Sequence, residues 1–192
     1  NGSVLTMTAS HAISYTLDGT DPRALGGGNV GLAYSGPIFL SNSVLVKART
    51  LNVSGGSNVW SGLNEAIFGR SVAPEDLQIS EVMYHPPAPT AAELLVNTNF
   101  TDEDFEFVEL RNTGTSLLDL YQVRFTNGIH FNFTTGSMPV LAVGQSVVLV
   151  HNQAAFETRY GPGRPVAGTY DGHLSNAGDR LTLVDCLGGI IA

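Results

Sequence analysis

Apolar and polar residues alternate with a period of two along most of this chain, which is the pattern of β-strands that bury one face. Residues rich in Gly, Pro and Asp separate the alternating runs, as turns between strands require. The pattern therefore predicts an all-β chain of many short strands. The clearest runs are Val4–Thr8, Ala12–Leu17, Val44–Leu51, Leu77–Tyr84 and Arg180–Asp185.

The segment Asp104–Asn112 departs from this alternation. Its apolar residues change phase between Phe107 and Val108, so that both faces of the expected strand carry apolar side chains. A β-bulge would explain the change, and so would burial of both faces.

Three further segments carry local signals. Asn127 and Gly128 lie between two alternating runs and predict a hairpin with a type I′ turn, in which both residues have positive φ. Ala154–Tyr160 is expected to form a short helix capped by Asn152. Ala91–Val96 is expected to form a helical turn, so the fold should contain one short helix.

Composition supports this fold class and suggests two domains. The 192 residues include 22 Gly and 9 Pro, which favour tight turns over helices. The length is sufficient for two small domains, each with its own core. Ser71–Pro74 has the composition of a short linker. We therefore expect one β-sandwich at residues 1–72 and a second, with the one short helix, at residues 73–192.

The charge distribution excludes some partners. A net charge of −8 repels phosphate backbones and argues against nucleic acid. Residues 1–72 carry a net charge of +1, whereas residues 73–192, with 5 basic and 14 acidic side chains, carry −9. No apolar run approaches the roughly 20 residues that cross a bilayer, so we expect no membrane insertion. The single cysteine, Cys186, cannot form an internal disulfide.

Residues 3–68 resemble a known accessory domain. The elements TLDGTDPR (Thr16–Arg23), YSGPIFL, VLVKART and VWSGLNEAIF follow in the order seen in the immunoglobulin-like C-terminal domain of chitobiases and β-hexosaminidases. The resemblance implies an all-β domain without catalytic residues, appended to large secreted bacterial proteins. It does not imply hexosaminidase activity.

Residues 77–190 resemble the lamin-tail domain, an immunoglobulin-like sandwich of nuclear lamins and of many bacterial surface proteins. The matching elements are ISEVMYHP, EFVELRNTG, LDLYQVRFTNG, LAVGQSVVLVHN and GHLSNAGDRLTLVDCLGG. The insertion between Pro87 and Asp104 resembles the bacterial branch. Together the two resemblances imply tandem immunoglobulin-like β-sandwiches.

The chain is expected to be a piece of a longer multidomain protein, because it begins without a leader and ends at Ala192 where the closing strand of the second sandwich should begin. If a sandwich lacks one strand, the neighbouring strand exposes backbone N–H and C=O groups that have no hydrogen-bond partner. Self-association through paired strands is therefore a hypothesis, and strictly monomeric sedimentation would contradict it.

An acidic stretch is the main candidate for a binding site. Six carboxylates and no basic residue lie between Glu93 and Glu109. Asp102, Asp104 and Glu106 place oxygen donors at alternate positions, an arrangement that suits Ca²⁺ when backbone carbonyls join in. A solvated acidic loop without metal is the alternative, since the full calcium-loop signature is missing.

Aromatic residues of the first domain are a second candidate. Trp60, Tyr15 and Tyr34 could stack against sugar rings, as expected for a relative of domains on carbohydrate-active enzymes. The alternative is ordinary core packing, because large aromatic side chains dominate cores.

The sequence contains no pattern that indicates an active site. Its five histidines have no metal-ligand spacing, and neither a GxSxG nor an HExxH motif occurs. Gly26–Gly31 satisfies GxGxxG but does not follow a strand and open a helix, so we interpret it as a surface loop. Glu109 is expected to pair with Arg111 or Arg124.

These observations favour a non-catalytic structural or adhesive module pair of a larger secreted or cell-surface bacterial protein. A carbohydrate-binding accessory region of a secreted enzyme, with the catalytic domain elsewhere, is the alternative. Expected partners are other domains of the parent protein and a cell-surface polysaccharide or protein. No cofactor is expected apart from the Ca²⁺ considered above.

Overall fold

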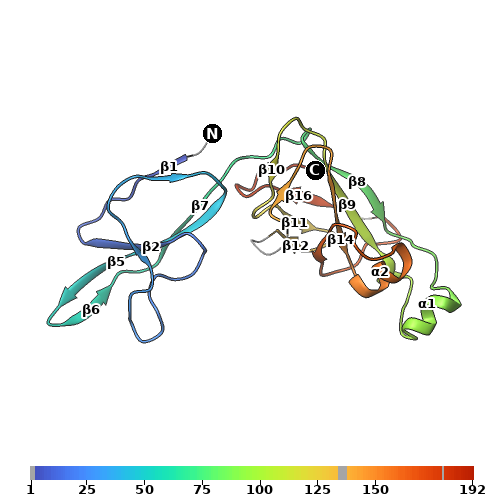
Figure 1. Ribbon diagram of the computed structural model, residues 1–192, viewed down its shortest axis with the longest axis horizontal. Helices are drawn as coiled ribbons and strands as arrows, with labels where there is room; N and C mark the ends of the chain where they lie inside the picture. The colour runs from blue at the N-terminus through green and yellow to red at the C-terminus, as the bar shows by residue number, and fades with distance from the viewer. Residues whose placement is uncertain (1–2, 134–137, 179) are drawn as a thin grey trace. The chain divides into compact units, whose positions relative to one another are not determined.

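The computed structural model describes residues 3–133, 138–178 and 180–192, which form mostly short β-strands (Figure 1). The chain divides into two compact units, Asn1–Arg70 and Ser71–Ala192, called unit 1 and unit 2. The prediction of an all-β fold is confirmed. None of the helices in the described parts of the chain is long and apolar enough to span a membrane.

Unit 1 is built from a two-stranded sheet, β1–β4, and a five-stranded sheet in which β5 is central. The first half of β5 pairs with β7 and its second half pairs with β6. Buried side chains of Leu5, Leu40 and Val46 join the two sheets in one apolar cluster. The strands are β1 (Ser3–Leu5), β2 (Ala12–Thr16), β3 (Leu32–Ala33), β4 (Ile38–Leu40), β5 (Val44–Ser54), β6 (Ser57–Trp60) and β7 (Asn64–Phe68).

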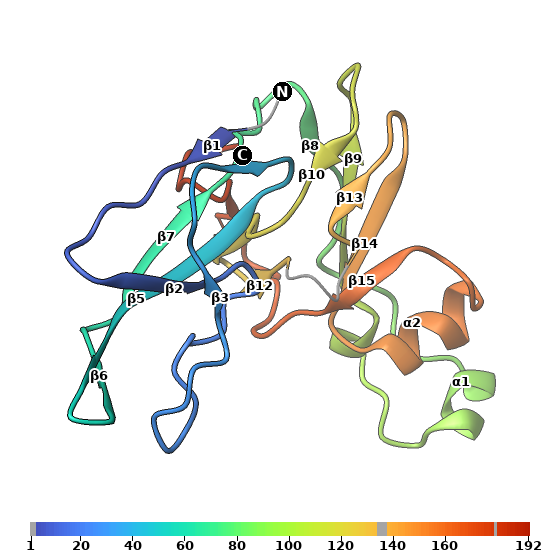
Figure 2. The ribbon, with the colours of Figure 1, turned by 60° about the vertical axis from the view of Figure 1, so that its left-hand side comes forward.

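Unit 2 contains a four-stranded sheet, β15–β14–β9–β8, a three-stranded sheet, β12–β11–β16, and a short pair, β10–β13 (Figure 1 and Figure 2). β14 and β15 are parallel and are connected by helix α2, because parallel neighbours need a crossover. The elements are β8 (Leu77–Met83), α1 (Ala91–Val96), the 3₁₀ turn η1 (Glu103–Phe105), β9 (Phe107–Asn112), β10 (Leu118–Asp119), β11 (Arg124–Asn127), β12 (Phe131–Asn132), β13 (Val140–Leu141), β14 (Ser146–Val150), α2 (Gln153–Tyr160), β15 (Val166–Thr169) and β16 (Thr182–Val184).

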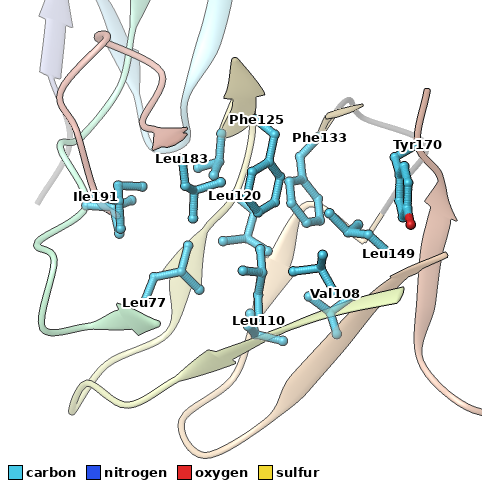
Figure 3. Packing of buried hydrophobic residues seen from close by; sticks show 14 of the residues in the cluster. Leu77, Val108, Leu110, Leu120, Phe125, Phe133, Leu149, Tyr170, Leu183 and Ile191 are labelled. Atoms are coloured by element: carbon cyan, nitrogen blue, oxygen red, sulfur yellow. The ribbon is translucent and has the colours of Figure 1, made fainter. Parts of the chain in front are cut away.

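The main core of unit 2 lies between its sheets. Leu77, Val108 and Leu110 of the four-stranded sheet share one cluster with Phe125 and Leu183 of the three-stranded sheet (Figure 3). Each of these five side chains is at most 3% exposed. Full burial of one such side chain contributes about 1.5–3 kcal/mol, so this cluster is the main source of stability in unit 2.

The opposite face of the four-stranded sheet is covered by α2. Phe107, Val148 and Val150 form a second cluster with Phe156 of this helix. The Phe107 and Phe156 rings meet edge to face, with centroids 5.5 Å apart. β9 is therefore buried on both faces, which confirms two-sided burial as the reason for the phase change between Phe107 and Val108.

The expectation of one short helix is wrong, because Ala91–Val96 forms a second helix, α1, of 6 residues. The Thr90 hydroxyl accepts a hydrogen bond from Glu93 N, and the Glu93 carboxylate accepts one from Thr90 N at 2.7 Å. This capping box satisfies two backbone donors that a helix start leaves without partners. The Thr-x-x-Glu signal is present in the sequence.

The hairpin expected at Asn127-Gly128 forms, but without the type I′ turn. Gly128 has φ +81°, whereas Asn127 is not among the positive-φ residues of the described chain. Phe125 pairs with Phe131, so the turn is centred on Gly128. Asn127 instead pairs with Thr182 of β16, and this long-range pairing keeps it in the strand.

The last residues of the chain lie beside β16. Leu183 N donates to Ala192 O at 2.7 Å, and Leu183 O accepts from Ile191 N at 2.8 Å. This edge of β16 is therefore paired within the chain, and strand-mediated self-association stays a prediction.

Candidate functional site

The acidic segment between β8 and β9, called the insert (residues 87–106), is fastened to α2 by Arg159. The Arg159 guanidinium forms two hydrogen bonds with the Glu93 carboxylate, Nε–Oε1 at 2.8 Å and Nη2–Oε2 at 2.9 Å. It also lies 3.4 Å from the centroid of the Phe105 ring and donates from Nη1 to Pro87 O at 3.0 Å. One cation therefore holds both ends of the insert.

The Glu93–Arg159 pair is largely withdrawn from water, with side chains 10% and 14% exposed. The hydrogen bonds from Arg159 lower the pKa of Glu93 to about 2, although burial alone would raise it. Bidentate Arg–carboxylate pairs are among the stronger side-chain interactions because both partners are charged and their geometry is fixed. A small apolar cluster supports the same contact and contains Leu94, Phe100, Phe105 and Ala155.

The three residues proposed for calcium do not converge. Asp102 starts η1 without a side-chain cap hydrogen bond, whereas Asp104 accepts hydrogen bonds from Thr101 N (2.8 Å) and Asn152 Nδ2 (2.9 Å). Burial would raise the pKa of Asp104, but these bonds outweigh it and lower the pKa. Glu106 is 1% exposed. Among the described residues, no group of three or more His, Cys, Asp or Glu is arranged to hold a metal, and calcium stays a prediction.

Glu106 is the most deeply buried of these carboxylates. It accepts hydrogen bonds from the Tyr170 hydroxyl at 3.2 Å and from Leu174 N at 3.0 Å. Burial and the nearby Glu106 carboxylate raise the pKa of Tyr170 far above its ordinary value. The hydroxyl therefore stays protonated and serves as a hydrogen-bond donor to Glu106.

The fold also gathers two histidines that are far apart in sequence. The His151 ring lies 4.7 Å from the His173 ring and 5.8 Å from the Tyr170 ring, measured between centroids. His173 Nδ1 is 3.5 Å from a Glu103 carboxylate oxygen. His151 Nδ1 is buried without a hydrogen-bond partner in the described structure. Sequence spacing gave no signal for this cluster, because three different loops supply it.

This cluster lacks the parts that acyl or phosphoryl chemistry needs. The Tyr170 hydroxyl, whose ring lies next to His151, is buried and donates to Glu106. A nucleophile must reach both a base and a substrate. The geometry therefore supports a structural role, in which the Glu106 and histidine contacts join the insert to the end of β14.

The pairing expected for Glu109 is wrong. Its carboxylate accepts a hydrogen bond from the Ser80 hydroxyl at 2.6 Å. In the ladder Ile79 pairs with Leu110 and Glu81 pairs with Glu109, so Ser80 is the extra residue of a register shift in β8 and lies beside Glu109. Arg124 donates instead to the backbone carbonyls of Gln122 and Asp185.

The three aromatic candidates of unit 1 lie in two places. Tyr15 is 8% exposed and meets Tyr34 edge to face, with centroids 6.4 Å apart. The Tyr34 hydroxyl accepts from Met7 N at 3.1 Å. Trp60 donates from Nε1 to Gly27 O at 2.8 Å, which holds the glycine-rich loop against β6. Sugar stacking on these rings stays a prediction.

The glycine-rich loop and the preceding turn have structural roles. The loop leads into β3 and not into a helix, so it lacks the context of a phosphate-binding loop. Asp18 accepts from Thr20 N at 2.9 Å, as an aspartate-stabilised turn requires. The hydrogen bonds from Arg49 lower the pKa of Asp21 well below its ordinary value. Both Arg49–Asp21 bonds, at 2.8 and 2.7 Å, connect this turn to β5.

Comparison with known proteins gives two family matches. Residues 70–192 match the family model described as Lamin Tail Domain, and residues 4–62 match the one described as Fn3 associated. No curated protein and no solved structure matches the chain. Neither match shows the chitobiase resemblance of residues 3–68, which stays a prediction. Because the first match covers more than half of a chain with an immunoglobulin-like all-β fold, the chain belongs to the lamin tail domain family.

Proposed function

We propose that this chain is a non-catalytic structural or adhesive pair of modules in a larger secreted or cell-surface bacterial protein. Unit 1 is, in this proposal, an accessory sandwich of the chitobiase C-terminal kind, and unit 2 is a lamin tail domain. The matched families support it because they describe appended modules and not catalytic domains.

One observation carries the proposal: three carboxylates of the insert are occupied by hydrogen bonds inside the fold. Glu93 is bound to Arg159, Asp104 to Asn152, and Glu106 to Tyr170. A general acid or base must instead reach a substrate proton. Carboxylates that bind their own scaffold make the insert rigid, and a rigid segment suits mechanical or adhesive roles.

The proposed location also rests on charge. Net charge −8 keeps the chain from nucleic acid and suits an acidic surface in an extracellular, polymer-rich setting. Partners in this proposal are neighbouring domains of the parent protein and a cell-surface polysaccharide or protein. A carbohydrate-binding accessory role is the second candidate, and a pocket in unit 2 whose lining includes Arg124, Asn132 and Asp171 favours it.

The test measures turnover and retention on the same purified chain. Fluorogenic esters, phosphodiesters and glycosides are incubated with the chain, and beads coated with it are washed over peptidoglycan and chitin. We expect no turnover, and bead retention that is lost when the chain is unfolded by heat. Turnover that disappears in both Tyr170→Phe and Glu106→Gln would overturn the proposal. Absence of retention on every surface, including intact bacterial envelopes, would contradict the proposed adhesive role.

A further inference from the structure

A shallow pocket of about 380 Å³ opens on unit 2 beside the hairpin of β11 and β12. Its lining includes Arg124, His130, Asn132 and Asp171. Arg124 and Asn132 are opposite each other in the β11–β12 pair, so both side chains lie on the same face. His130 N donates to Asp171 O at 2.8 Å, and Asp171 N donates to His130 O at 2.9 Å, which places these two side by side as well.

These four side chains keep hydrogen-bonding capacity for a ligand. Asn132 Nδ2 donates to Gln122 Oε1 at 3.0 Å, and Arg124 Nη1 donates to backbone carbonyls. Within the part of the chain that the structure describes, no hydrogen bond or ion pair engages Asn132 Oδ1, the His130 ring, the Asp171 carboxylate or the remaining Arg124 N–H groups. The insert carboxylates, by contrast, are mostly occupied by their own fold.

Charge decides which class of ligand suits the pocket. Arg124 and Asp171 contribute one positive and one negative charge to the lining. An anionic ligand would be repelled by the Asp171 carboxylate, and a cationic ligand would be repelled by the Arg124 guanidinium. A neutral ligand with adjacent hydroxyl groups can instead accept from Arg124 and donate to Asp171 without an unpaired charge.

Phe131, which is also in the lining, lies on the other face of the hairpin from Asn132, because successive residues of a strand face opposite sides. Its ring packs against the main core of unit 2 and against β15 at Gly168, where a Cβ would come within 3.1 Å of Phe131 Cε2. The groups open to a ligand are therefore the polar ones. A sugar presents several adjacent hydroxyl groups at its edge, which matches this set of planar polar side chains.

We propose that this pocket binds a neutral mono- or disaccharide unit of a polysaccharide. The inference deepens the carbohydrate-binding candidate above and assigns its site to unit 2 instead of to Trp60, Tyr15 and Tyr34 of unit 1. The pocket volume is at the lower end of small-ligand sites, roughly 300–1,000 Å³. Because the pocket is open, binding should be weak and exchange fast, with affinity gained when several copies act on one polymer.

The experiment is a ¹H–¹⁵N NMR titration of the whole chain with cellobiose, chitobiose, xylobiose and mannobiose. We expect saturable shifts of the His130, Asn132 and Asp171 amides with at least one disaccharide. Asp171→Ala should weaken this binding about tenfold, because it removes a charge-assisted hydrogen bond. Asp102→Ala removes the same charge outside the pocket and should leave binding unchanged, and well-dispersed spectra of both variants verify that they fold.

The outcomes separate this inference from the proposed function. Shifts confined to Trp60 and Tyr34 would overturn the unit 2 site and support the carbohydrate role through unit 1. No shift with any of the four sugars would overturn the inference and leave the structural role standing. Equal weakening by Asp171→Ala and Asp102→Ala would show an effect of overall charge and would also overturn it.

Discussion

Replacing Glu93 with Gln should release the insert from α2. The mutation keeps the shape of the side chain but removes the charge that Arg159 binds through two hydrogen bonds. A folded-state pKa of about 2 against an ordinary value of 4.5 corresponds to roughly 3 kcal/mol of favourable interaction. Gln can still accept one hydrogen bond from Arg159, so we expect a loss of about 2 kcal/mol.

The same pair gives a pH dependence with a definite sign. The folded-state pKa of Glu93 is depressed, so its stabilisation is fully present above the unfolded-state pKa near 4.5. It is lost as the pH falls from about 4.5 toward 2, because in this range the unfolded state binds a proton at Glu93 that the folded state does not bind. Wild-type unit 2 should therefore lose more stability over this range than the Glu93→Gln variant.

Two measurements test the reasoning. Hydrogen exchange of peptides from the insert reports local release, and chemical denaturation followed by tyrosine near-ultraviolet circular dichroism reports the free energy of unfolding. Glu103→Gln is the matched control, because its ion pair with His173 is more than half exposed and should contribute at most about 1 kcal/mol. Equal effects of Glu93→Gln and Glu103→Gln on both measurements would refute the assignment of Glu93 as the anchor of the insert.

Three other predictions concern separate parts of unit 2. Gly128→Ala should lower the free energy of unfolding by about 1–3 kcal/mol, because φ is +81° and a Cβ would lie 2.6 Å from Leu181 Cδ2. An unchanged midpoint of chemical denaturation would contradict the turn geometry. Tyr170→Phe should lower the melting temperature, because buried Glu106 loses a donor worth about 1–3 kcal/mol; no change would show that the bond is dispensable. Millimolar CaCl₂ should leave the melting temperature unchanged, because Asp104 is already hydrogen-bonded to Asn152; a saturable rise would instead establish calcium binding.

Local patterns in the sequence predicted most of the strands, because alternation and turn residues act over a few positions. The two-sided burial of β9 followed from the phase change between Phe107 and Val108. Helix α1 forms where a helical turn was expected, and the spacing of Thr90 and Glu93 is that of a capping box, a local signal of a helix start. The strands, the two-sided burial of β9 and the start of α1 depend on residues close together in the chain, so they can be deduced from the sequence.

Contacts between distant segments were beyond such patterns. Glu93 and Arg159 are 66 residues apart, and nothing in the sequence links them before β14, α2 and β15 are placed. The turn at Asn127 was misjudged for the same reason, because pairing with Thr182 outweighs the local preference for a type I′ turn. In the acidic insert Glu93, Asp104 and Glu106 bind the protein itself, whereas Glu103 is more than half exposed, and the sequence gives no signal that separates these carboxylates.

The position of Arg159 on the crossover helix sets the order in which unit 2 can be completed during translation. Glu93 leaves the ribosome 66 residues ahead of its partner, an interval of roughly 3 to 13 s at ordinary synthesis rates. Throughout that interval the Phe105 ring lacks its cation and the nascent acidic segment has no counterion from α2. Closure of the insert therefore cannot precede the synthesis of α2, which makes it a late step in the formation of unit 2.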